Sequence, residues 1–296
     1  MQQESIQKSI LAWSLLIFLG LVWGSSYILM KKGVQVFSGP EVACLRIFSA
    51  AILLLPWSLP RLRQLSWRQY GLLFLVGLLE SLMPAFLFAQ AQTQLDSALN
   101  GVLSSVTPVF TLLIGRLWFH RPIVKSELQG TLLGLLGTLF LVLASKSLVG
   151  TVNYYVFLPL LACFCYGLNT NLVKYYLHGL DATTIASVFL LLVGIVAGVG
   201  LFTQTSFLVK LQVVEGAYTA AGYVLILGAL GSAMGQLLFV KLIKNTSPVF
   251  ANTFAFIIPL VALGWGLLDG EVLVWGQYVG IMTILAGVHS VNKNQA

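Results

Sequence analysis

The sequence predicts an all-α integral membrane protein, and three observations support this fold class. Of the 296 residues, 58% are hydrophobic and only 8% are charged, with a mean hydropathy of +0.93. That composition is too apolar for a surface that faces water. The charged residues gather between apolar runs of about 20 residues, the length at which a helix crosses a bilayer. The runs also lack the alternation over ~10 residues that is typical of barrel strands.

Ten apolar runs predict ten transmembrane helices joined by short connections. The first run follows Lys8 and is interpreted as a retained span, because it is long, contains tryptophan and lacks a small-residue cleavage site. The predicted spans are 10–30, 40–59, 69–91, 97–119, 126–145, 155–177, 183–204, 218–240, 247–268 and 274–292.

The net charge of +7 is explained by membrane orientation, since no basic domain exists that could bind nucleic acid. A cytoplasmic N-terminus puts most of the 16 basic residues at the inner side. Arg46 falls inside a span, and the outer side keeps only Lys31, Lys32, Lys146 and Lys210. We therefore expect a multi-pass protein of a bacterial-type inner membrane, with both termini in the cytoplasm.

The chain repeats itself at about half its length. Pro259 follows Pro108 by 151 residues, and Gly280 follows Gly130 by 150. Near the start of each half, Trp23-Gly24 and Lys31 match Tyr166-Gly167 and Lys174 at a spacing of 143. Residues 1–150 and 151–296 are thus predicted to be two five-helix repeats. Because five is odd, the second repeat is inverted in the membrane, and a central pocket lies between the two.

These motifs resemble the EamA branch of the drug/metabolite transporter superfamily. The resemblance rests on Trp23-Gly24-Ser25-Ser26, Pro40, Arg46 and the proline in the fourth span, and on Pro259, Gly270-Glu271 and Gly280 in the second repeat. It implies a ten-helix carrier of small metabolites, often an exporter of amino acids or related compounds. One departure is that His120-Arg121 replaces the glutamate expected after the fourth span.

Glu80 is the predicted proton-coupling residue. It lies eleven residues from either end of the span 69–91 and therefore near the bilayer centre. A carboxylate there is costly unless it faces water, a partner or a proton. The alternative is a protonated carboxyl that links helices structurally.

Arg46 lies six residues inside its span, roughly 9 Å along the helix. Its guanidinium either extends outward to the interface or points inward, where two parallel hydrogen bonds could hold a substrate carboxylate.

Polar and aromatic side chains inside the spans complete the predicted substrate site. Asn100, Ser104, Thr107 and Thr111 recur at helical spacing beside Pro108, so they either line a wet cavity or bond helices together. The rings suit an apolar or aromatic substrate or, alternatively, simple helix packing. The predicted substrate-binding residues are Trp23, Tyr27, Arg46, Glu80, Asn100, Ser104, Thr107, Tyr166, Asn169, Gln236, Asn252, Phe256 and Trp265.

Other features favour structural roles. Cys44, Cys163 and Cys165 lie in apolar runs and are expected to be free buried thiols. Asp269 and Glu271 either cap a helix or gate the pocket. Glycines spaced four apart predict close helix packing and, less strongly, a weak homodimer in place of a monomer. The glycine pairs are Gly130 and Gly134, Gly194 and Gly198, Gly231 and Gly235, and Gly276 and Gly280.

The sequence therefore predicts a secondary transporter and not an enzyme. The three histidines are scattered and no metalloprotease, phosphate-loop or nucleophile-elbow motif occurs, so no catalytic residue, metal or cofactor is expected. The expected partners are a small-molecule substrate and the lipid bilayer. Two alternatives remain: a lipid-handling flippase or sensor, which would have a groove open sideways to the bilayer, and a channel, which would need a polar lining across the whole membrane.

Overall fold

The computed structural model describes residues 2–95, 97–144, 154–268 and 274–292, and these residues form helices and connections without a strand. Eight helical segments are long and apolar enough to cross a membrane. The predicted spans 126–145 and 274–292 form α7 (Lys125–Ala144) and α15 (Trp275–Asn292), which are not among those eight. The all-helical membrane fold is confirmed, and the number of ten spans stays a prediction. Asp269 and Glu271 lie outside the described residues.

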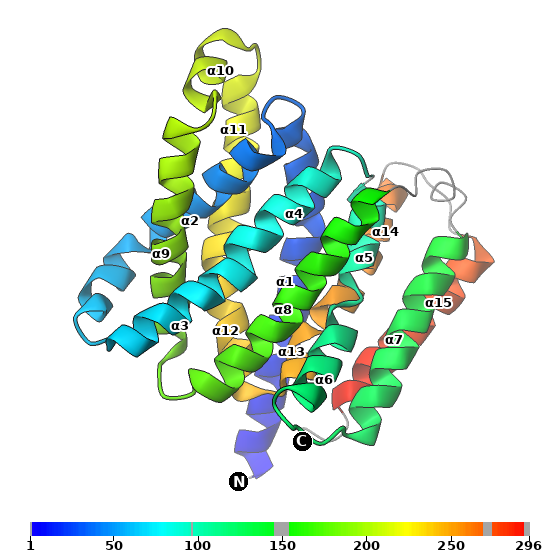
Figure 1. Ribbon diagram of the computed structural model, residues 1–296. Helices are drawn as coiled ribbons and strands as arrows, with labels where there is room; N and C mark the ends of the chain where they lie inside the picture. The colour runs from blue at the N-terminus through cyan, green and yellow to red at the C-terminus, as the bar shows by residue number, and fades with distance from the viewer. Residues whose placement is uncertain (1, 96, 145–153, 269–273, 293–296) are drawn as a thin grey trace.

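The two halves share most of their order of elements, and among the described residues the second half has two additional short helices (Figure 1). Before α7, the first half contains α1 (Gln2–Val34), α2 (Gly39–Leu62), α3 (Trp67–Gly77), the π-helical η1 (Leu78–Leu82), α4 (Met83–Gln92), α5 (Ser97–Ser104) and α6 (Thr107–Leu117). Before α15, the second contains the 3-10 turn η3 (Tyr154–Val156), α8 (Phe157–Tyr176), α9 (Ala182–Thr203), α10 (Phe207–Val213), α11 (Ala217–Ile226), the π-helical η4 (Leu227–Met234), α12 (Gly235–Asn245), α13 (Pro248–Asn252) and α14 (Phe254–Leu268). Helix α1 begins and α15 ends at the same end of the bundle.

Two of the predicted continuous spans are broken. The span 97–119 is divided into α5 and α6 at Ser105-Val106, because Pro108 has no N–H and its ring clashes with the carbonyl of the residue four before it, Ser104. The span 247–268 is divided into α13 and α14 at Thr253. Both breaks lie in the fourth span of their half, so backbone polar groups are freed from α-helical pairing at similar places in the two halves.

Polar caps fix where several helices begin. Ser38 accepts a hydrogen bond from the N–H of Glu41, and the Glu41 carboxylate accepts one from the N–H of Ser38. Ser66 and Gln69 form the same reciprocal pair at the start of α3. Because each pair satisfies two N–H groups that have no partner within the helix, the apolar runs start as helices at defined residues.

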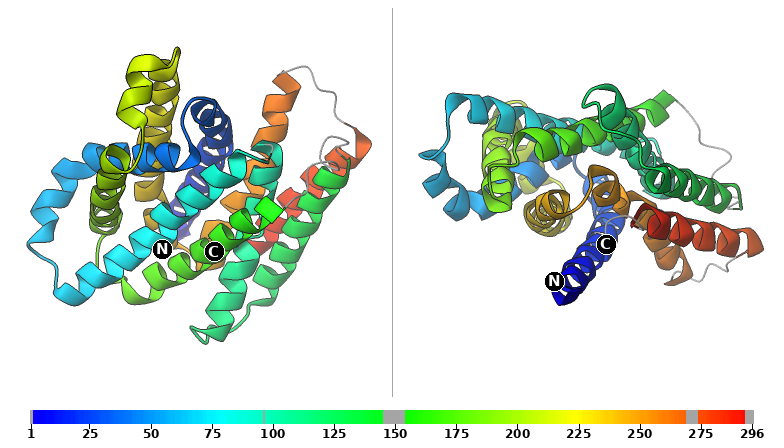
Figure 2. Two further views of the ribbon diagram at one scale, coloured as in Figure 1. Left: turned by 45° about the horizontal axis from the view of Figure 1, so that its top comes forward. Right: turned by 90° about the horizontal axis from the view of Figure 1, so that it is seen from below.

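Helices α7 and α15 pack against each other along their length and lie to one side of the bundle (Figures 1 and 2). A methyl group on Gly130 would lie 2.5 Å from the Gly287 carbonyl oxygen, and one on Gly287 would lie 2.5 Å from the Gly134 nitrogen. In α9, a methyl group on Gly194 would meet Ala51 of α2 at 2.2 Å. These glycines therefore serve close packing within the chain, which was the first of the two predicted roles.

Candidate functional site

A break in α-helical geometry presents Glu80 to the centre of the bundle. The N–H of Met83 bonds to the carbonyl of Leu78, the wider i−5 spacing of a π-helix. Pro84 contributes to this geometry, since it has no N–H for the Glu80 carbonyl. Single π turns inside α-helices often mark functional sites. The result is a carboxylate with only 4% of its surface exposed, as predicted from its depth in the span.

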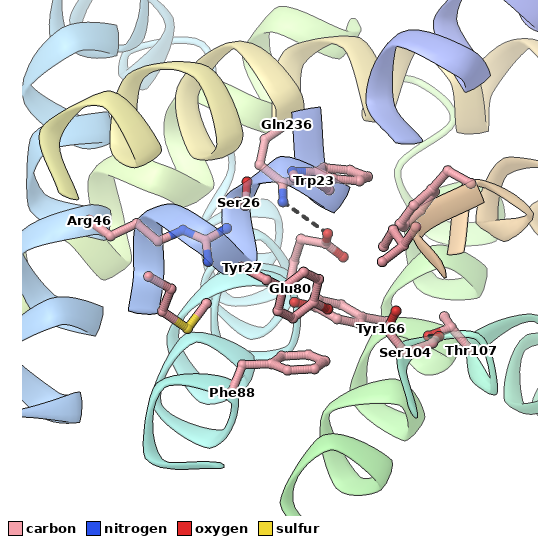
Figure 3. A pocket seen from close by; sticks show the side chains of 13 residues that line it. Trp23, Ser26, Tyr27, Arg46, Glu80, Phe88, Ser104, Thr107, Tyr166 and Gln236 are labelled. Atoms are coloured by element: carbon pink, nitrogen blue, oxygen red, sulfur yellow. Dashed lines mark hydrogen bonds between the residues drawn. The ribbon is translucent and has the colours of Figure 1, made fainter. Parts of the chain in front are cut away.

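Two amides from other helices hold this carboxylate. Gln236 of α12 donates from Nε2 to one oxygen of Glu80 at 3.0 Å, the contact drawn in Figure 3. Asn169 of α8 donates from Nδ2 to the other oxygen. Each carboxylate oxygen thus accepts an N–H, which is the pattern that stabilises an ionised carboxylate. Within the described part of the chain, the amide oxygens of Asn169 and Gln236 are buried without a hydrogen-bond partner.

Arg46 points into the bundle and does not extend to the interface, so the inward alternative describes its position (Figure 3). Its Nε donates to the Ser232 hydroxyl at 2.7 Å, which anchors α2 to η4. Among the described residues, its two Nη groups have no hydrogen-bond partner and no ion pair joins it to Glu80. A small cavity of about 10 Å³ is bordered by both residues. The free face of the guanidinium is therefore available to an anionic group.

Aromatic rings surround these charges. Phe88 of α4 stacks on Tyr166 of α8, with ring centres 6.1 Å apart and planes at 21°. Tyr27 of α1 meets the edge of Phe88 at 5.9 Å. On another side Trp23 and Phe254 lie 4.4 Å apart, and the Trp23 indole N–H donates to the Gly231 carbonyl at 2.7 Å. The walls are thus rigid rings that suit an apolar or aromatic body.

Together these groups enclose a central cavity of about 50 Å³. Most elements of the first half contribute to its wall, and α8, α12 and α14 contribute from the second. The lining residues are Trp23, Ser26, Tyr27, Met30, Arg46, Glu80, Phe88, Ser104, Thr107, Tyr166, Gln236, Phe254 and Ile258. Of the predicted substrate-binding residues, this brings together Trp23, Tyr27, Arg46, Glu80, Ser104, Thr107, Tyr166 and Gln236, with Asn169 behind Glu80.

Two predicted polar residues do not line this pocket. Asn100 is fully buried and donates to the Phe88 carbonyl and to the Gln92 side chain, both at 3.2 Å, so it fastens α5 to α4. Asn252 is also fully buried. It donates to the hydroxyls of Thr111 and Thr170 at 2.8 and 2.9 Å and joins α13 to α6 and α8. Both amides bond helices together, the alternative role of such residues.

Two predicted aromatic residues do not line the pocket either. Phe256 is fully buried, and a methyl group on Gly134 of α7 would meet its ring at 2.5 Å. Since residues two apart on a helix face nearly opposite directions, Phe254 faces the pocket instead. Trp265 is 41% exposed and donates from its indole N–H to the Ser25 hydroxyl at 3.1 Å, outside the pocket.

Several lining residues were not predicted. Ser26 and Met30 lie on the same face of α1 as Trp23 and Tyr27, so helical spacing from these two could have identified them. Ile258 follows Phe254 by one turn and could have been found in the same way. Phe88 has no comparable signal, because its position depends on how α4 turns after the π-helical segment.

The fold and this site define a helical, multi-pass membrane protein with a charged, aromatic-walled pocket between its halves. The profile of the EamA-like transporter family matches residues 11–143 and again residues 153–292. The chain belongs to the EamA-like transporter family, whose members are transporters and not enzymes. The double match agrees with the repeat in the order of elements.

Relatives of known sequence are also transporters by name. The chain is 28% identical over 289 residues to the uncharacterized inner membrane transporter YedA of Escherichia coli (strain K12), covering 92% of this chain and 88% of that one. It is 21% identical to an uncharacterized transporter of Archaeoglobus fulgidus, covering 96% and 99% of the two chains. A protein crystal structure superposes with a TM-score of 0.70 over 94% of this chain and 95% of the other, at 14% identity, which shows the shared fold.

Proposed function

We propose that this transporter is a secondary active carrier that exports small organic metabolites by alternating access. The proposed substrates are amino acids or related aromatic and amphipathic compounds, and movement is coupled to protons through Glu80. The observation that carries the proposal is one cavity that contains a buried carboxylate, a guanidinium with free Nη groups and several aromatic rings. The proposed location is a bacterial-type inner membrane, in keeping with the name of the Escherichia coli relative. The proposed orientation, with both termini cytoplasmic, rests on the distribution of basic residues.

The substrate class follows from matching chemical groups. The Nη groups of Arg46 offer a planar fork that fits a carboxylate with two parallel hydrogen bonds. Tyr27, Phe88 and Tyr166 offer ring faces and edges to an apolar side chain. A compound with a carboxylate at one end and an apolar or aromatic group at the other would satisfy both.

The size of the cavity supports a change of conformation during transport. A volume of about 50 Å³ holds one or two waters, whereas pockets for organic ligands measure roughly 300–1,000 Å³. The described conformation is therefore too closed for a metabolite, and helices around the pocket must move to admit one. At one side of the pocket, Trp23, Phe239 and Phe254 pack ring to ring, with centres 4.4 to 5.3 Å apart. Such a barrier argues against a continuously open channel.

Proton coupling rests on the environment of Glu80. A buried intramembrane carboxylate marks a functional site by default, and the central cavity reaches this one. Taking up a proton would remove one acceptor and require an amide of Asn169 or Gln236 to turn its oxygen toward the new O–H. Both amides have an unpaired oxygen available for this.

The test is transport by purified protein in liposomes under an imposed pH gradient. A panel of amino acids, nucleosides, sugars and vitamins is read by mass spectrometry. We expect amino-acid-like compounds to accumulate in the parent, and Glu80→Gln to abolish the gradient-driven part while the protein stays folded. Glu215→Gln, at an exposed carboxylate between α10 and α11, is the matched control and should transport like the parent. Equal gradient-driven transport by Glu80→Gln and parent would contradict the role of Glu80.

One observation favours lipid handling as a second candidate function. An apolar groove of about 400 Å³ lies between α2, α9 and the α11–η4 segment, separate from the central pocket. Its wall is formed by Leu45, Phe48, Ser49, Ile52, Leu53, Phe202, Leu225 and Ala229. If no soluble compound moves in the liposome assay and a labelled phospholipid changes leaflet instead, this second function replaces the first.

A further inference from the structure

Two lysines tie together the ends of α8 and α12. Lys174, near the end of α8, donates from its ammonium to the carbonyls of Ile243 and Lys244 at 3.1 Å and of Thr246 at 2.6 Å. These carbonyls belong to the end of α12, where the last turn has no partners within the helix and carries the negative end of the helix dipole. All three N–H bonds of the ammonium are thus used on a neighbouring helix terminus.

The contact is reciprocal. Lys244, in the last turn of α12, donates from its ammonium to the carbonyl of His178 at 2.9 Å and to that of Leu180. Both acceptors lie just beyond the end of α8. Lys174 therefore binds the carbonyls that end α12, and Lys244 binds carbonyls just beyond the end of α8. We call this pair, Lys174 with Lys244, the lysine clasp.

The clasp closes the bundle at the end where α1 begins (Figure 1). Directly beside it, Val173 and Ile243 are fully buried. The helices it joins are the same two whose amides, Asn169 and Gln236, meet on Glu80. Helices α8 and α12 are therefore bridged twice, once at the pocket and once at this end.

The opposite end of the molecule lacks the equivalent contact. Lys31 corresponds to Lys174 in the sequence repeat and lies at the other end of the bundle, near the end of α1. Its side chain is exposed and, within the described residues, makes no hydrogen bond or ion pair. The two related lysines therefore differ in their contacts. The far end is fastened in another way, by the ion pair at 2.6 Å between Lys210 of α10 and Glu41 of α2.

We infer that the lysine clasp is the gate at the end of the molecule where α1 begins, and that it must open for substrate to pass between the pocket and that side. The inference rests on the proposed alternating access and adds the residues that fasten one of its two states. It needs no particular substrate and no proton coupling. Removing either ammonium shifts the population toward the conformation that is open at this end.

The experiment measures access to the pocket from each side. A single reporter cysteine replaces Ser26, a lining residue, in a chain whose Cys44, Cys163 and Cys165 are changed to alanine. A membrane-impermeant maleimide is applied to right-side-out and inside-out vesicles without substrate or pH gradient. We expect Lys174→Met and Lys244→Met to speed labelling from the clasp side by about tenfold and to slow it from the other side. Lys241→Met is the matched control, since Lys241 lies on the same helix, is exposed and, among the residues that the structure describes, makes no hydrogen bond or ion pair.

The outcomes separate the gate from the function on which it rests. Faster labelling from the clasp side together with slower labelling from the far side supports the gate, because a misfolded protein would label faster from both. If both clasp variants label as slowly from the clasp side as parent and Lys241→Met, the clasp does not hold the gate and the inference is wrong. If the parent labels from both sides as fast as an unhindered surface cysteine, the pocket is open to both sides at once, alternating access fails, and the gate fails with it.

Discussion

Arg46 uses one of its three guanidinium nitrogens for structure and leaves two for a ligand. Nε is fixed by the Ser232 hydroxyl, so the planar fork is held in one orientation before any substrate arrives. A preorganised donor loses less side-chain entropy on binding than a mobile one. Both carboxylate oxygens of the neighbouring Glu80 already accept hydrogen bonds from amides. Of these two charged residues, Arg46 is therefore the one with groups left to bind a ligand.

This arrangement predicts how an Arg46→Lys variant behaves. A lysine has one ammonium and cannot bond Ser232 while gripping both oxygens of a carboxylate. We expect the affinity for carboxylated substrates to fall by about tenfold or more, the effect of losing a charge-assisted hydrogen bond worth roughly 1.5–3 kcal/mol. Competition by a carboxylate and by its neutral amide analogue, measured in liposomes, checks this. The amide should compete equally against both proteins, and unchanged affinity for the carboxylate would mean that the fork does not bind it.

At the scale of elements, the third span of each half contains a π-helical segment. Adding the repeat spacing of 151 to residues 78–82 of η1 gives residues 229–233, and these lie inside η4 (Leu227–Met234). The first segment positions Glu80, and the second supplies Ser232 to Arg46 and leads directly into Gln236. The pocket is therefore built around two π-helical segments that occupy corresponding positions in the repeat and carry different side chains.

The α7–α15 pair predicts a glycine-specific loss of stability. In Gly287→Ala the added methyl would meet backbone atoms of Gly134 and Gly130 at 2.5 to 2.9 Å, and backbone cannot move aside as a side chain can. We expect a destabilisation of about 1–3 kcal/mol from overpacking. Thermal unfolding in detergent is the measurement. Gly222→Ala, in α11 with nothing within 4 Å, is the matched control and should unfold at or above the parent temperature.

The cap of α9 predicts a dependence of stability on pH. Asp181 accepts hydrogen bonds from the N–H and hydroxyl of Thr184. Burial acts to raise the pKa of Asp181, but these hydrogen bonds outweigh it and hold the pKa below its usual value. Because the pKa is lower in the folded state, the stabilising contribution is present above the ordinary value of about 3.9 and is lost as pH falls through the folded value.

Asp181→Ala should therefore cost about 1 kcal/mol of stability at neutral pH, the usual effect of removing a cap. Asp181→Asn keeps the capping oxygen and should lose less. Detergent unfolding curves from pH 7 down to acid pH test this, and the difference in stability between the parent and the Asp181→Asn variant should shrink toward acid. A difference that is constant with pH would show that the charge of Asp181 adds nothing.

At the scale of the whole molecule, α8 and α12 link the pocket to one end. Both helices contact the Glu80 carboxylate through an amide, and both contribute a lysine to the clasp. A change at Glu80 and a change at the clasp thus act on the same pair of helices. The liposome assay tests Glu80, and the labelling assay tests the clasp. The two tests are independent, because the labelling assay requires neither substrate nor proton gradient.

Much of this was predictable from the sequence, because it depends on residues close together in the chain. Apolar runs of membrane length indicated the fold class, and Glu80 stood out because a charge in the middle of such a run is rare. Pro108 and the spaced glycines were recognisable from local geometry, although the break that Pro108 makes in the fourth span was not foreseen. The repeat and the family motifs needed only comparison of the chain with itself and with known patterns.

By itself, the sequence determined that this is a helical membrane protein with an internal repeat and a carboxylate, Glu80, in the middle of a span, whereas the inward direction of Arg46 came from the structure. Only the tertiary structure decided which polar groups meet. The partners of Glu80 lie 89 and 156 residues away, and Ser232 lies 186 residues from Arg46. Such contacts depend on how each helix is rotated about its axis. Rotation is fixed by packing against distant helices, which is why Phe254 faces the pocket while Phe256, Asn100 and Asn252 do not.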